Sequence, residues 1–522
     1  MTMSRRRGMA LAWAAVLGSL LVVSAKASVT VSGVFGDNMV LQRGVKVPVW
    51  GWAEPGEKIT LAFHGQTNSA TADAEGRWRV ELAPMEAMAE GAELRVSGKN
   101  ELLFKNVVVG EVWLCSGQSN MQFTMGGALD ADKEAAAANY PLIRQLGVPC
   151  RIDAVPQRTL QASWVVCSPQ TARDFTAVGY FFGLELHRKL GVPIGLINAS
   201  WGGSCIEPFT PPDGFRAVSN APSIAPIVKR VNESDPTLPE GHAAFERAMA
   251  EFKSWLPQAE AAVKAGTYPP PAPRVPAVGV GDQDPCMKCN AMIAPLAPYA
   301  LRGAIWYQGE SNAGDGMAYV DKTKALVLGW RALWGAEIPC YHVQLAGFGA
   351  DWAMFREAQT KIMDAIPRTG MAVTTDIGAA ADIHPRNKQD VGWRLAQWAL
   401  AKDYGKQDVV FSGPICKSQK AEGGKVVLMF DSVGKGLLAG VKEGLAPVKE
   451  EASGTLDEFV IAGADKKWVK AEAKIEGNAV VVASPEVKEP VAVRYAYVPC
   501  PQGRLLYNRD GLPAVPFRTD TW

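Results

Sequence analysis

The sequence is poor in histidine and in net charge, and each shortage limits what the chain does. Only five of the 522 residues are histidine, so few positions can supply a histidine base. The 54 Lys and Arg residues balance the 53 Asp and Glu residues, which leaves a net charge of +1. This balance excludes a basic field for nucleic acid and an acidic tail. The expected partners are therefore small or neutral molecules.

Cysteine is also scarce. Nine cysteines are too few for a disulfide scaffold in a chain of this length, and their odd number leaves at least one thiol free. Cys286 and Cys289 form the only C-x-x-C pair, and no second Cys or His pair has a matching spacing. Because a structural zinc site needs about four ligands, the sequence predicts no metal site.

Long apolar runs are absent after the first residues of the chain. Three arginines at 5–7 precede an apolar segment at 9–23, and Ala-Lys-Ala at 25–27 matches a signal-peptide cleavage site. The apolar segment is shorter than the ~20 residues of a membrane span. We therefore expect residues 1–27 to be a signal peptide and the mature protein to be exported, to the periplasm or the extracellular space, without a membrane span.

Three regimes of composition divide the rest of the chain. Residues 28–106 alternate apolar and polar positions between turns, which is typical of a small antiparallel β-sandwich. Residues 107–405 alternate strands and helices and predict an α/β domain, a parallel sheet with helices on both faces. A Pro-rich insertion at about 208–285 interrupts this domain and contains an expected helix at 241–264. Residues 406–522 return to period two and predict a second β domain.

The α/β region has a regular order of elements. The expected strands are 107–114, 193–198, 301–307, 339–345 and 370–375, and the expected helices are 178–190, 319–334, 352–366 and 387–404.

The first of these strands ends in a serine-containing turn. The turn reads Ser-Gly-Gln-Ser-Asn at 116–120, and it places a serine hydroxyl at the carboxyl end of a buried strand. Such a serine is either a nucleophile or a simple helix cap. Polar loops at 202–204, 308–312 and 382–384 follow three further strands. Since the carboxyl ends of parallel strands share one edge of a sheet, we expect the four loops to meet there.

A serine nucleophile needs a base, and elimination among the five histidines identifies one. His384 follows the carboxyl end of a strand and has a carboxylate, Asp382, two residues before it. The other four histidines lie in the N-terminal sandwich, the insertion, a helix and the interior of a strand. His384 is therefore the candidate base for a serine nucleophile.

Four motifs resemble those of a known family. They read GQSNM at 117–121, WGGS at 201–204, IWYQGESN at 305–312 and DIHP at 382–385. They resemble the sialate O-acetylesterase family, a branch of the SGNH hydrolases, and the resemblance extends over nearly the whole mature chain. It implies a flavodoxin-like αβα sandwich, flanked by antiparallel β domains, that hydrolyses acetyl esters of sialic acid or other glycans without a cofactor.

The resemblance also implies roles for single residues. Ser119 is the expected nucleophile, His384 the base and Asp382 its orienting carboxylate. Gly203 and Gln308 are the expected oxyanion donors, together with the backbone N–H of Ser119.

Two departures from the superfamily pattern leave alternatives open. SGNH hydrolases place Asp three residues before His, whereas the spacing here is two and position 381 is Ala. Asp376, or a Ser–His pair without a carboxylate, is therefore an alternative to Asp382. The superfamily uses Asn in its third block, where this chain has Gln308 and Asn312; we predict Gln308 as the donor. Glu310 either supports its loop or contacts substrate.

Two other functions are compatible with the sequence. A glycoside hydrolase would pair Glu310 with Glu111 or Glu207, because that chemistry needs two carboxylates about 5–9.5 Å apart. A non-catalytic carbohydrate-binding protein is suggested by the two β domains and the 16 tryptophans.

Overall fold

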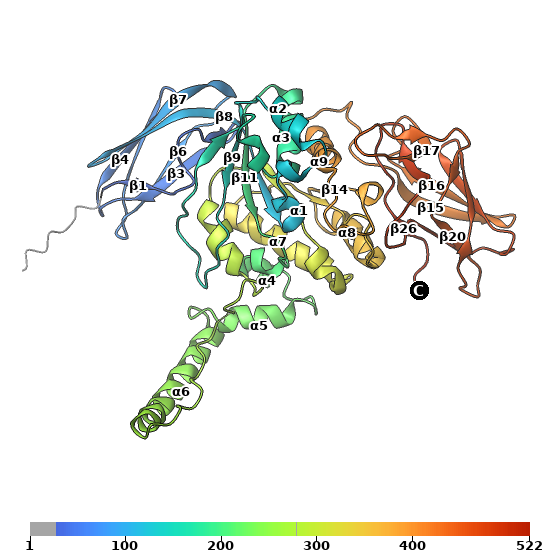
Figure 1. Ribbon diagram of the computed structural model, residues 1–522. Helices are drawn as coiled ribbons and strands as arrows, with labels where there is room; N and C mark the ends of the chain where they lie inside the picture. Colours follow the sequence, from blue (N-terminus) through green and yellow to red (C-terminus); the bar gives the residue numbers. More distant parts are fainter. Residues whose placement is uncertain (1–27, 278) are drawn as a thin grey trace, which may run out of the picture.

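The computed structural model describes residues 28–277 and 279–522. The expected signal peptide therefore lies outside the described residues. Figure 1 shows a central α/β body with β-sheets at both ends of the chain and a helical arm that projects from the body. None of the helices in the described part of the chain has both the length and the apolar character of a membrane span.

The centre of the molecule is a mixed β-sheet. Along its main path the strand order is β10-β9-β11-β8-β12-β13-β14. The strands are β8 (Glu101–Gly117), β9 (Ile143–Gly147), β10 (Trp164–Val166), β11 (Ile194–Ser200), β12 (Gly303–Tyr307), β13 (Cys340–Val343) and β14 (Thr369–Ala372). All neighbours on this path are parallel except β10, which pairs antiparallel with β9 at one edge.

The sheet corrects the prediction of a purely parallel sheet. All five expected strands are present, but β9 and β10 were not expected. The reason is visible in β9, which reads IRQLG and buries Arg144 and Gln145 in its middle. These side chains are hydrogen-bonded, Arg144 Nη1 to the carbonyl of Asn38 at 2.9 Å and Gln145 Oε1 to the N–H of Thr176 at 2.9 Å. A strand whose buried positions are polar lacks the apolar pattern by which strands are recognised.

Helices cover both faces of the sheet, as predicted. On one face α3 (Ala177–Leu190) packs against α9 (Lys388–Lys402), and on the other α4 (Pro212–Ala217) and α8 (Ala353–Ala365) pack against α7 (Ala318–Trp334) (Figure 1). All four expected helices are present with ends shifted by a few residues. α9 ends at Lys402, and Asp403 is its C-cap.

The chain order of the strands identifies the edge where a ligand would bind. β8 comes first in sequence and lies between β11 and β12, so the chain first builds one side of the sheet and then the other. Gly117 of β8 is level with Ser200 of β11 and Tyr307 of β12. The loops that follow these three strands therefore begin side by side at the switch point, where open α/β sheets form their binding crevices.

The N-terminal sheets are joined to the central sheet through β8. One sheet is antiparallel, with order β1 (Thr30–Val31), β3 (Val47–Trp52) and β6 (Arg77–Leu82). The other strands are β4 (Lys58–Phe63), β5 (Gln66–Thr71) and β7 (Met88–Ser97), which pairs with the first half of β8, and β2 (Val40–Gln42), which pairs parallel with it. One hydrophobic core continues from these sheets into the central layers.

The C-terminal sheets have a hydrophobic core of their own. The five-stranded sheet contains β15 (Ile415–Glu422), β16 (Lys425–Asp431), β23 (Ala479–Ala483), β22 (Glu472–Glu476) and β19 (Thr455–Leu456). The smaller sheets contain β18 (Lys449–Glu450), β17 (Leu437–Val441) and β25 (Leu505–Asn508), and β21 (Val469–Lys470), β20 (Phe459–Ala462), β24 (Ala492–Tyr495) and β26 (Phe517–Arg518). All strand pairs in these sheets are antiparallel. Their core includes Leu428, Ile461 and Val480.

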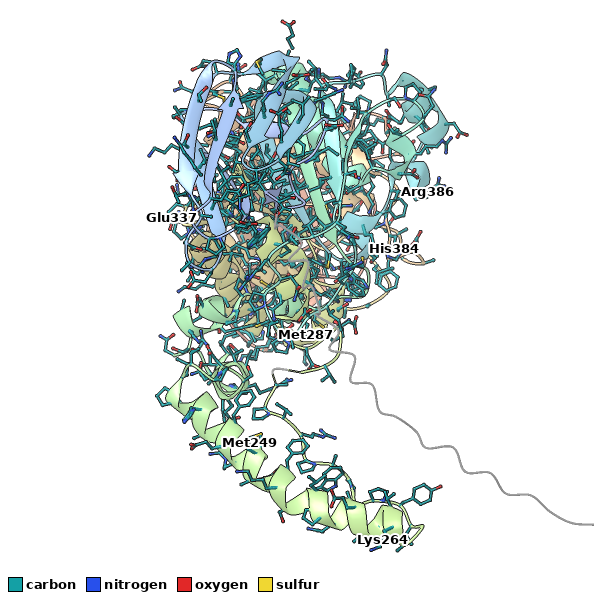
Figure 2. All side chains as sticks on the ribbon, turned by 90° about the vertical axis from the view of Figure 1, so that its left-hand side faces the viewer. Met249, Lys264, Met287, Glu337, His384 and Arg386 are labelled. Atoms are coloured by element: carbon teal, nitrogen blue, oxygen red, sulfur yellow. The ribbon has the colours of Figure 1, made fainter. Side chains whose placement is uncertain are left out.

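The predicted insertion contains the arm, formed by α5 (Ala225–Glu233) and α6 (Pro239–Lys264). Figure 2 shows Met249 and Lys264 along the arm, and Met287 where the chain has returned to the body. α6 confirms the helix that was expected at 241–264. The remaining helical segments are short: α1 (Ser119–Gln122), α2 (Ala131–Ala137), η1 (Met125–Gly127), η2 (Ala172–Asp174), η3 (Glu207–Phe209), η4 (Cys289–Ile293), η5 (Ala294–Leu296), η6 (Glu310–Asp315) and η7 (Thr375–Ile377).

Candidate active site

Ser119 is held at the carboxyl end of β8 by a turn that only glycine can make. Gly117 has a φ of 137°, and a Cβ atom there would lie 2.1 Å from the carbonyl oxygen of Tyr307. A residue with a side chain would clash with the neighbouring strand. Ser119 is the first residue of α1, whose N-cap is Gln118. Its hydroxyl is therefore not used as a helix cap, and the residue is half-buried.

His384 reaches this serine from a loop 265 positions later in the chain. Its Nε2 atom lies 2.8 Å from Ser119 Oγ. The imidazole is about one third exposed, and it stacks on Phe123 with ring centroids 6.4 Å apart. Burial and the nearby Lys388 ammonium lower the pKa of His384, and Asp382 opposes both effects. A neutral imidazole in hydrogen-bonding distance of a hydroxyl has the geometry of a general base.

The two candidate carboxylates lie in different surroundings. Asp382 Oδ1 accepts the backbone N–H of His384 at 2.8 Å, and it lies 3.9 Å from His384 Nδ1, beyond hydrogen-bonding distance. Asp376 makes two hydrogen bonds of 2.7 Å with Arg394 on α9 and accepts the hydroxyl of Tyr507 at 3.2 Å. The structure therefore places Asp382 beside the imidazole and engages Asp376 in a buried ion pair.

The loop after β11 brings Gly203 to the same edge. Gly203 is exposed with a φ of 69°. Its N–H donates to none of the described residues, and neither does the N–H of Ser119. Gly202 donates to Gln122 Oε1 at 2.8 Å, which ties this loop to α1. Two unpaired N–H groups thus lie on the loops that flank the Ser119 hydroxyl.

Gln308 and Asn312 lie below this edge and are buried. The Gln308 amide donates to the carbonyl of Ser204 at 3.0 Å and to Asn312 Oδ1 at 2.7 Å. Asn312 donates to Glu207 at 3.1 Å and to Asp315 at 2.7 Å. Each amide group has only two protons to donate, so both side chains are fully used in holding the loops together.

The returning end of the insertion clamps the Gly203 loop, which sequence reasoning missed. Gln283 donates to the carbonyl of Gly203 at 3.1 Å and accepts the N–H of Cys205 at 2.9 Å. The buried Lys288 ammonium donates to Ser204 Oγ at 2.5 Å. No motif in the sequence marks Gln283 or Lys288, because their contacts depend on a chain return that follows the arm.

Behind Ser119 and His384 lies a buried polar network. Asn120 donates to Glu310 Oε1 at 2.5 Å and to the carbonyl of Ile383 at 3.0 Å. Lys388 Nζ donates to Asn120 Oδ1 at 2.5 Å. Glu310 therefore supports its loop through Asn120. Sequence reasoning noted Asn120 only as part of its motif and missed Lys388 altogether.

The other carboxylates considered for glycoside hydrolysis are engaged elsewhere. Glu111 is fully buried in β8, 2.5 Å from Arg43 Nε and 2.8 Å from Arg302 Nε. It is level with Ile194, the first residue of β11, whereas Glu310 follows the last residues of β12. Glu207 lies 2.6 Å from Lys322 Nζ. In the described residues, none of these three carboxylates contacts another.

The chain is similar to known carbohydrate esterases. Residues 287–401 match the family model of a carbohydrate esterase, the sialic acid-specific acetylesterase. The sialate O-acetylesterase of Mus musculus is 28% identical over 92% of each chain, and that of Homo sapiens is 27% identical over 92% of this chain and 90% of its own. A crystal structure of a carbohydrate acetylesterase from Xanthomonas citri is 37% identical, covers 95% of this chain and 100% of its own, and has a TM-score of 0.77. The chain belongs to the sialate O-acetylesterase family.

As a sialate O-acetylesterase family member, the chain is an enzyme, a carboxylic ester hydrolase. The family model contains the loops of Gln308 and His384, whereas Ser119 lies before its first matched residue. An acetylated sugar is a substrate that suits an esterase of this family.

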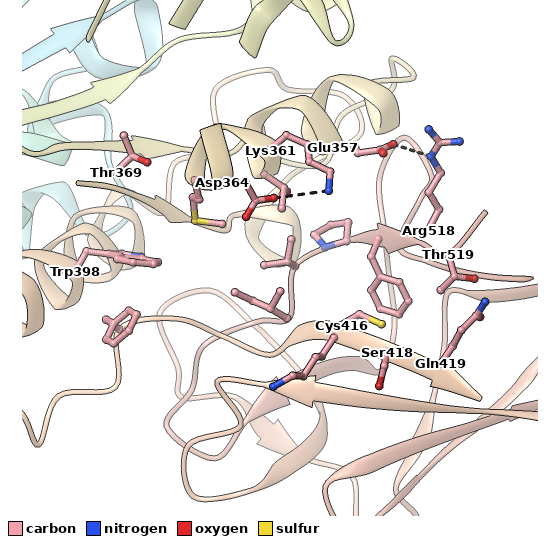
Figure 3. A pocket seen from close by; sticks show the side chains of 18 of the residues that line it. Glu357, Lys361, Asp364, Thr369, Trp398, Cys416, Ser418, Gln419, Arg518 and Thr519 are labelled. Atoms are coloured by element: carbon pink, nitrogen blue, oxygen red, sulfur yellow. Dashed lines mark hydrogen bonds and ion pairs between the residues drawn. The ribbon is translucent and has the colours of Figure 1, made fainter. Parts of the chain in front are cut away.

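This sialate O-acetylesterase family member also has a cavity that the loops of Gln308 and His384 do not line. The cavity holds about 720 Å³ between the central layers and the C-terminal sheets (Figure 3). Trp398, Phe411 and Phe517 line it, and the ion pair between Glu357 and Arg518 lies at its side. Neither Ser119 nor His384 lines this cavity.

The cysteines of the sialate O-acetylesterase family member are all free thiols. No disulfide joins any of the nine, and Cys286 and Cys289 are buried as a plain pair. Within residues 28–277 and 279–522, no group of three or more His, Cys, Asp or Glu side chains is placed to hold a metal ion.

Proposed function

We propose that this esterase removes O-acetyl groups from sialic acid or other acetylated glycans through an acetyl-enzyme intermediate on Ser119. The observation that carries the proposal is the 2.8 Å contact between Ser119 Oγ and His384 Nε2. It joins the first and last of the four family motifs, which lie on separate loops. A hydroxyl and a neutral imidazole at this distance form the nucleophile and base of acyl transfer.

The reaction has two steps. In the first, Ser119 Oγ attacks the acetyl carbonyl carbon while His384 Nε2 takes the hydroxyl proton. The bond to the sugar oxygen then breaks, and His384 returns the proton to the departing sugar hydroxyl. In the second step His384 takes a proton from a water molecule, whose oxygen attacks the acetyl carbonyl carbon. The bond between that carbon and Ser119 Oγ then breaks, and His384 gives the proton to Ser119 Oγ, which releases acetic acid and restores free Ser119 and neutral His384.

The oxyanion is stabilised by the N–H groups of Ser119 and Gly203. Two observations support this assignment: neither N–H group donates to a described residue, and both belong to loops at the same edge of the sheet. Such preorganised donors are worth about 10²–10³ in rate each. Gln308 is the expected third donor; it would have to release Ser204 or Asn312 to act, and in its observed contacts it supports the Gly203 loop.

Asp382 is proposed as the carboxylate of the base. It accepts the backbone N–H of His384 and lies on the Nδ1 side of the ring. Its effect is to hold the loop and to favour the imidazolium that forms during attack. Because Nδ1 lies 3.9 Å away, a smaller contribution is expected than from a directly bonded aspartate.

The finer features of the architecture are proposals as well. We assign the central layers to the flavodoxin-like SGNH sandwich, supported by β8 between β11 and β12 with the nucleophile directly after it. The proposed divisions are an N-terminal β-sandwich at 28–106, the catalytic domain at 107–405 with its insertion at 208–285, and a C-terminal β domain at 406–522. Export to the periplasm or the extracellular space is supported by the signal-peptide pattern at 1–27.

The nucleophile is tested by measuring acetate released from p-nitrophenyl acetate and from acetylated sialosides, xylans and pectins. We expect Ser119→Ala to lower kcat by roughly 10⁴-fold or more. Ser116→Ala is the matched control, because Ser116 belongs to the same turn but is buried and donates to the carbonyl of Ala199. Mass spectrometry of a quenched reaction should place the acetyl group on the peptide that contains Ser119.

Two outcomes would contradict the proposal. If Ser119→Ala keeps its activity and Ser116→Ala loses it, Ser119 is not the nucleophile. New reducing ends without acetate would indicate a glycoside hydrolase instead.

A further inference from the structure

The buried network behind Ser119 contains a lysine whose position is costly for a purely structural residue. Lys388 is the first residue of α9 and is 0% exposed. Among the described residues it has no carboxylate within ion-pair distance. A buried cation without an ion pair is expensive. Such a residue is a candidate for a role in the neighbouring site.

Lys388 is connected to the two groups of the proposed acyl transfer by separate contacts. Lys388 donates to Asn120, the residue after Ser119. Asn120 in turn donates to the carbonyl of Ile383, which precedes His384. Through space, Lys388 Nζ lies 4.9 Å from the centroid of Phe123, the ring that stacks on His384. The ammonium of Lys388 and the imidazole of His384 thus both lie against the Phe123 ring.

We propose that Lys388 is a positioning residue of this esterase, which locks the His384 loop onto the Ser119 helix through Asn120 and places a positive charge behind the imidazole. The inference rests on the proposed Ser119–His384 chemistry and adds to it a residue that acts on the base through other groups.

The charge balance around Lys388 supports this role. The carboxylate of Glu310, on the far side of Asn120, and that of Asp382, in the His384 loop, are the acidic groups that face the ammonium. The Tyr307 ring lies on another side, with its centroid 5.2 Å from Nζ. Burial lowers the pKa of Lys388 to about 7, and the two carboxylates oppose this shift. Glu310 Oε2 is buried without a hydrogen-bond partner in the described residues, so the polar network is not saturated.

The positive charge has a definite consequence for pH dependence. Lys388 is one of two causes that lower the pKa of His384, burial being the first and Asp382 the opposing one. Because only neutral imidazole accepts the serine proton, kcat/KM should rise with pH through the pKa of His384, with a midpoint below the ordinary value of 6.5. Removing the charge of Lys388 removes one lowering cause and moves this midpoint to higher pH.

Two variants separate the charge from the hydrogen bond. Lys388→Met removes both, and Lys388→Gln removes the charge but keeps a donor for Asn120. We expect Lys388→Met to lower kcat/KM about 10-fold or more with little change in KM, because the His384 loop loses its alignment. Lys388→Gln should lose less rate. Both variants should move the acid limb of kcat/KM to higher pH.

The pKa of His384 can be read without relying on activity. The protein is labelled with ¹³C-histidine, and its five histidines are titrated by NMR, with His384→Asn to assign the signal. The expected result is a higher pKa of His384 in both Lys388 variants than in the unchanged protein. If Lys388→Met does not fold, Lys388→Gln carries the same measurement.

Lys402→Met is the matched control at the opposite end of the same helix. Lys402 also lies over an aromatic ring, with Nζ 4.0 Å from the centroid of Phe411, but it is remote from His384. We expect its rate, acid limb and NMR titration to match those of the unchanged protein. A rate loss in Lys388→Met with no movement of the His384 pKa, or the same movement in Lys402→Met, would overturn the inference. Activity that survives in Ser119→Ala would refute the proposed function and leave the NMR result intact.

Discussion

At the scale of single residues, two aspartates six positions apart in the chain lie in opposite surroundings. Asp382 is about half exposed and touches the loop of His384, whereas Asp376 is fully buried against Arg394. We propose that Asp382, which accepts the backbone N–H of His384, contributes mainly to catalysis. A carboxylate that neutralises a buried guanidinium contributes mainly to stability, since its loss leaves an uncompensated charge.

Asparagine substitution should separate these two aspartates. Asp376→Asn is expected to lower the free energy of unfolding by about 3 kcal/mol, because Arg394 is then buried without its counter-charge, with kcat per folded molecule unchanged. Asp382→Asn is expected to leave stability nearly unchanged and to lower kcat about 10-fold. Urea unfolding and acetate release, measured on both variants, check the prediction. The reverse pattern would make Asp376 the partner of His384.

At the scale of secondary-structure elements, β8 connects the N-terminal sheets to the central sheet. Its first half belongs to the N-terminal sheets, and its second half is the switch-point strand, which ends at Gly117, two residues before Ser119. Residues 107–114 are all buried, and Glu111 is the one charged residue among them. Arg43 and Arg302 neutralise its carboxylate. The position of Ser119 therefore depends on the packing of a strand that crosses the expected boundary at 106.

The turn at the end of β8 has little tolerance for substitution. Gly117→Ala combines a φ of 137° with a Cβ 2.1 Å from the Tyr307 carbonyl oxygen. We expect it to lower the free energy of unfolding by about 2 kcal/mol or more and to reduce activity, because the strand edge must move. Gly147→Ala at the end of β9 is the control, since no atom lies within 4 Å of its added Cβ. Equal stability of the two variants in thermal unfolding would show that the turn is not strained.

At the scale of the whole molecule, the insertion has two parts with different relations to the site. The arm projects from the body, and α6 packs on α5 (Figures 1 and 2). The returning segment contains Gln283, and Lys288 follows it; both hold the Gly203 loop. At the base of the arm, Arg230 of α5 lies 2.9 Å from Asp284 of the returning segment. This ion pair connects α5 to the returning segment at the base of the arm.

Removing α6, the larger part of the arm, should leave hydrolysis of a small ester intact. We expect a chain in which a short Gly-Ser linker replaces residues 239–277 to fold and to hydrolyse p-nitrophenyl acetate within about 2-fold of the unchanged rate, because Gln283 and Lys288 are kept. Gln283→Ala keeps the arm but frees the Gly203 loop, and should lower kcat about 10-fold. Steady-state kinetics of both proteins test this. If the protein without α6 is slow while Gln283→Ala keeps the unchanged rate, then α6, and not Gln283, supports the Gly203 loop.

The C-terminal sheets are also connected to the central layers. Tyr507 of β25 donates to Asp376, and Arg356 of α8 donates to the carbonyl of Val498 at 2.6 Å. These contacts join the C-terminal part of the chain to η7 and α8 of the central layers.

The sequence by itself determined the alternation of strands and helices and the position of the serine turn, and it predicted His384 as the base, because apolar periodicity and polar loops are local properties of a chain. It also identified the edge at which the loops meet, since parallel strands share their carboxyl ends. It did not determine β9, whose buried positions are polar, or the engagement of Gln308 and Asn312 in loop support. Only the tertiary structure decided that Asp376 pairs with Arg394, that Gln283 holds the Gly203 loop and that Lys388 lies behind the imidazole. Each of these contacts joins residues on separate elements, and its existence depends on burial and distance, which no local pattern records.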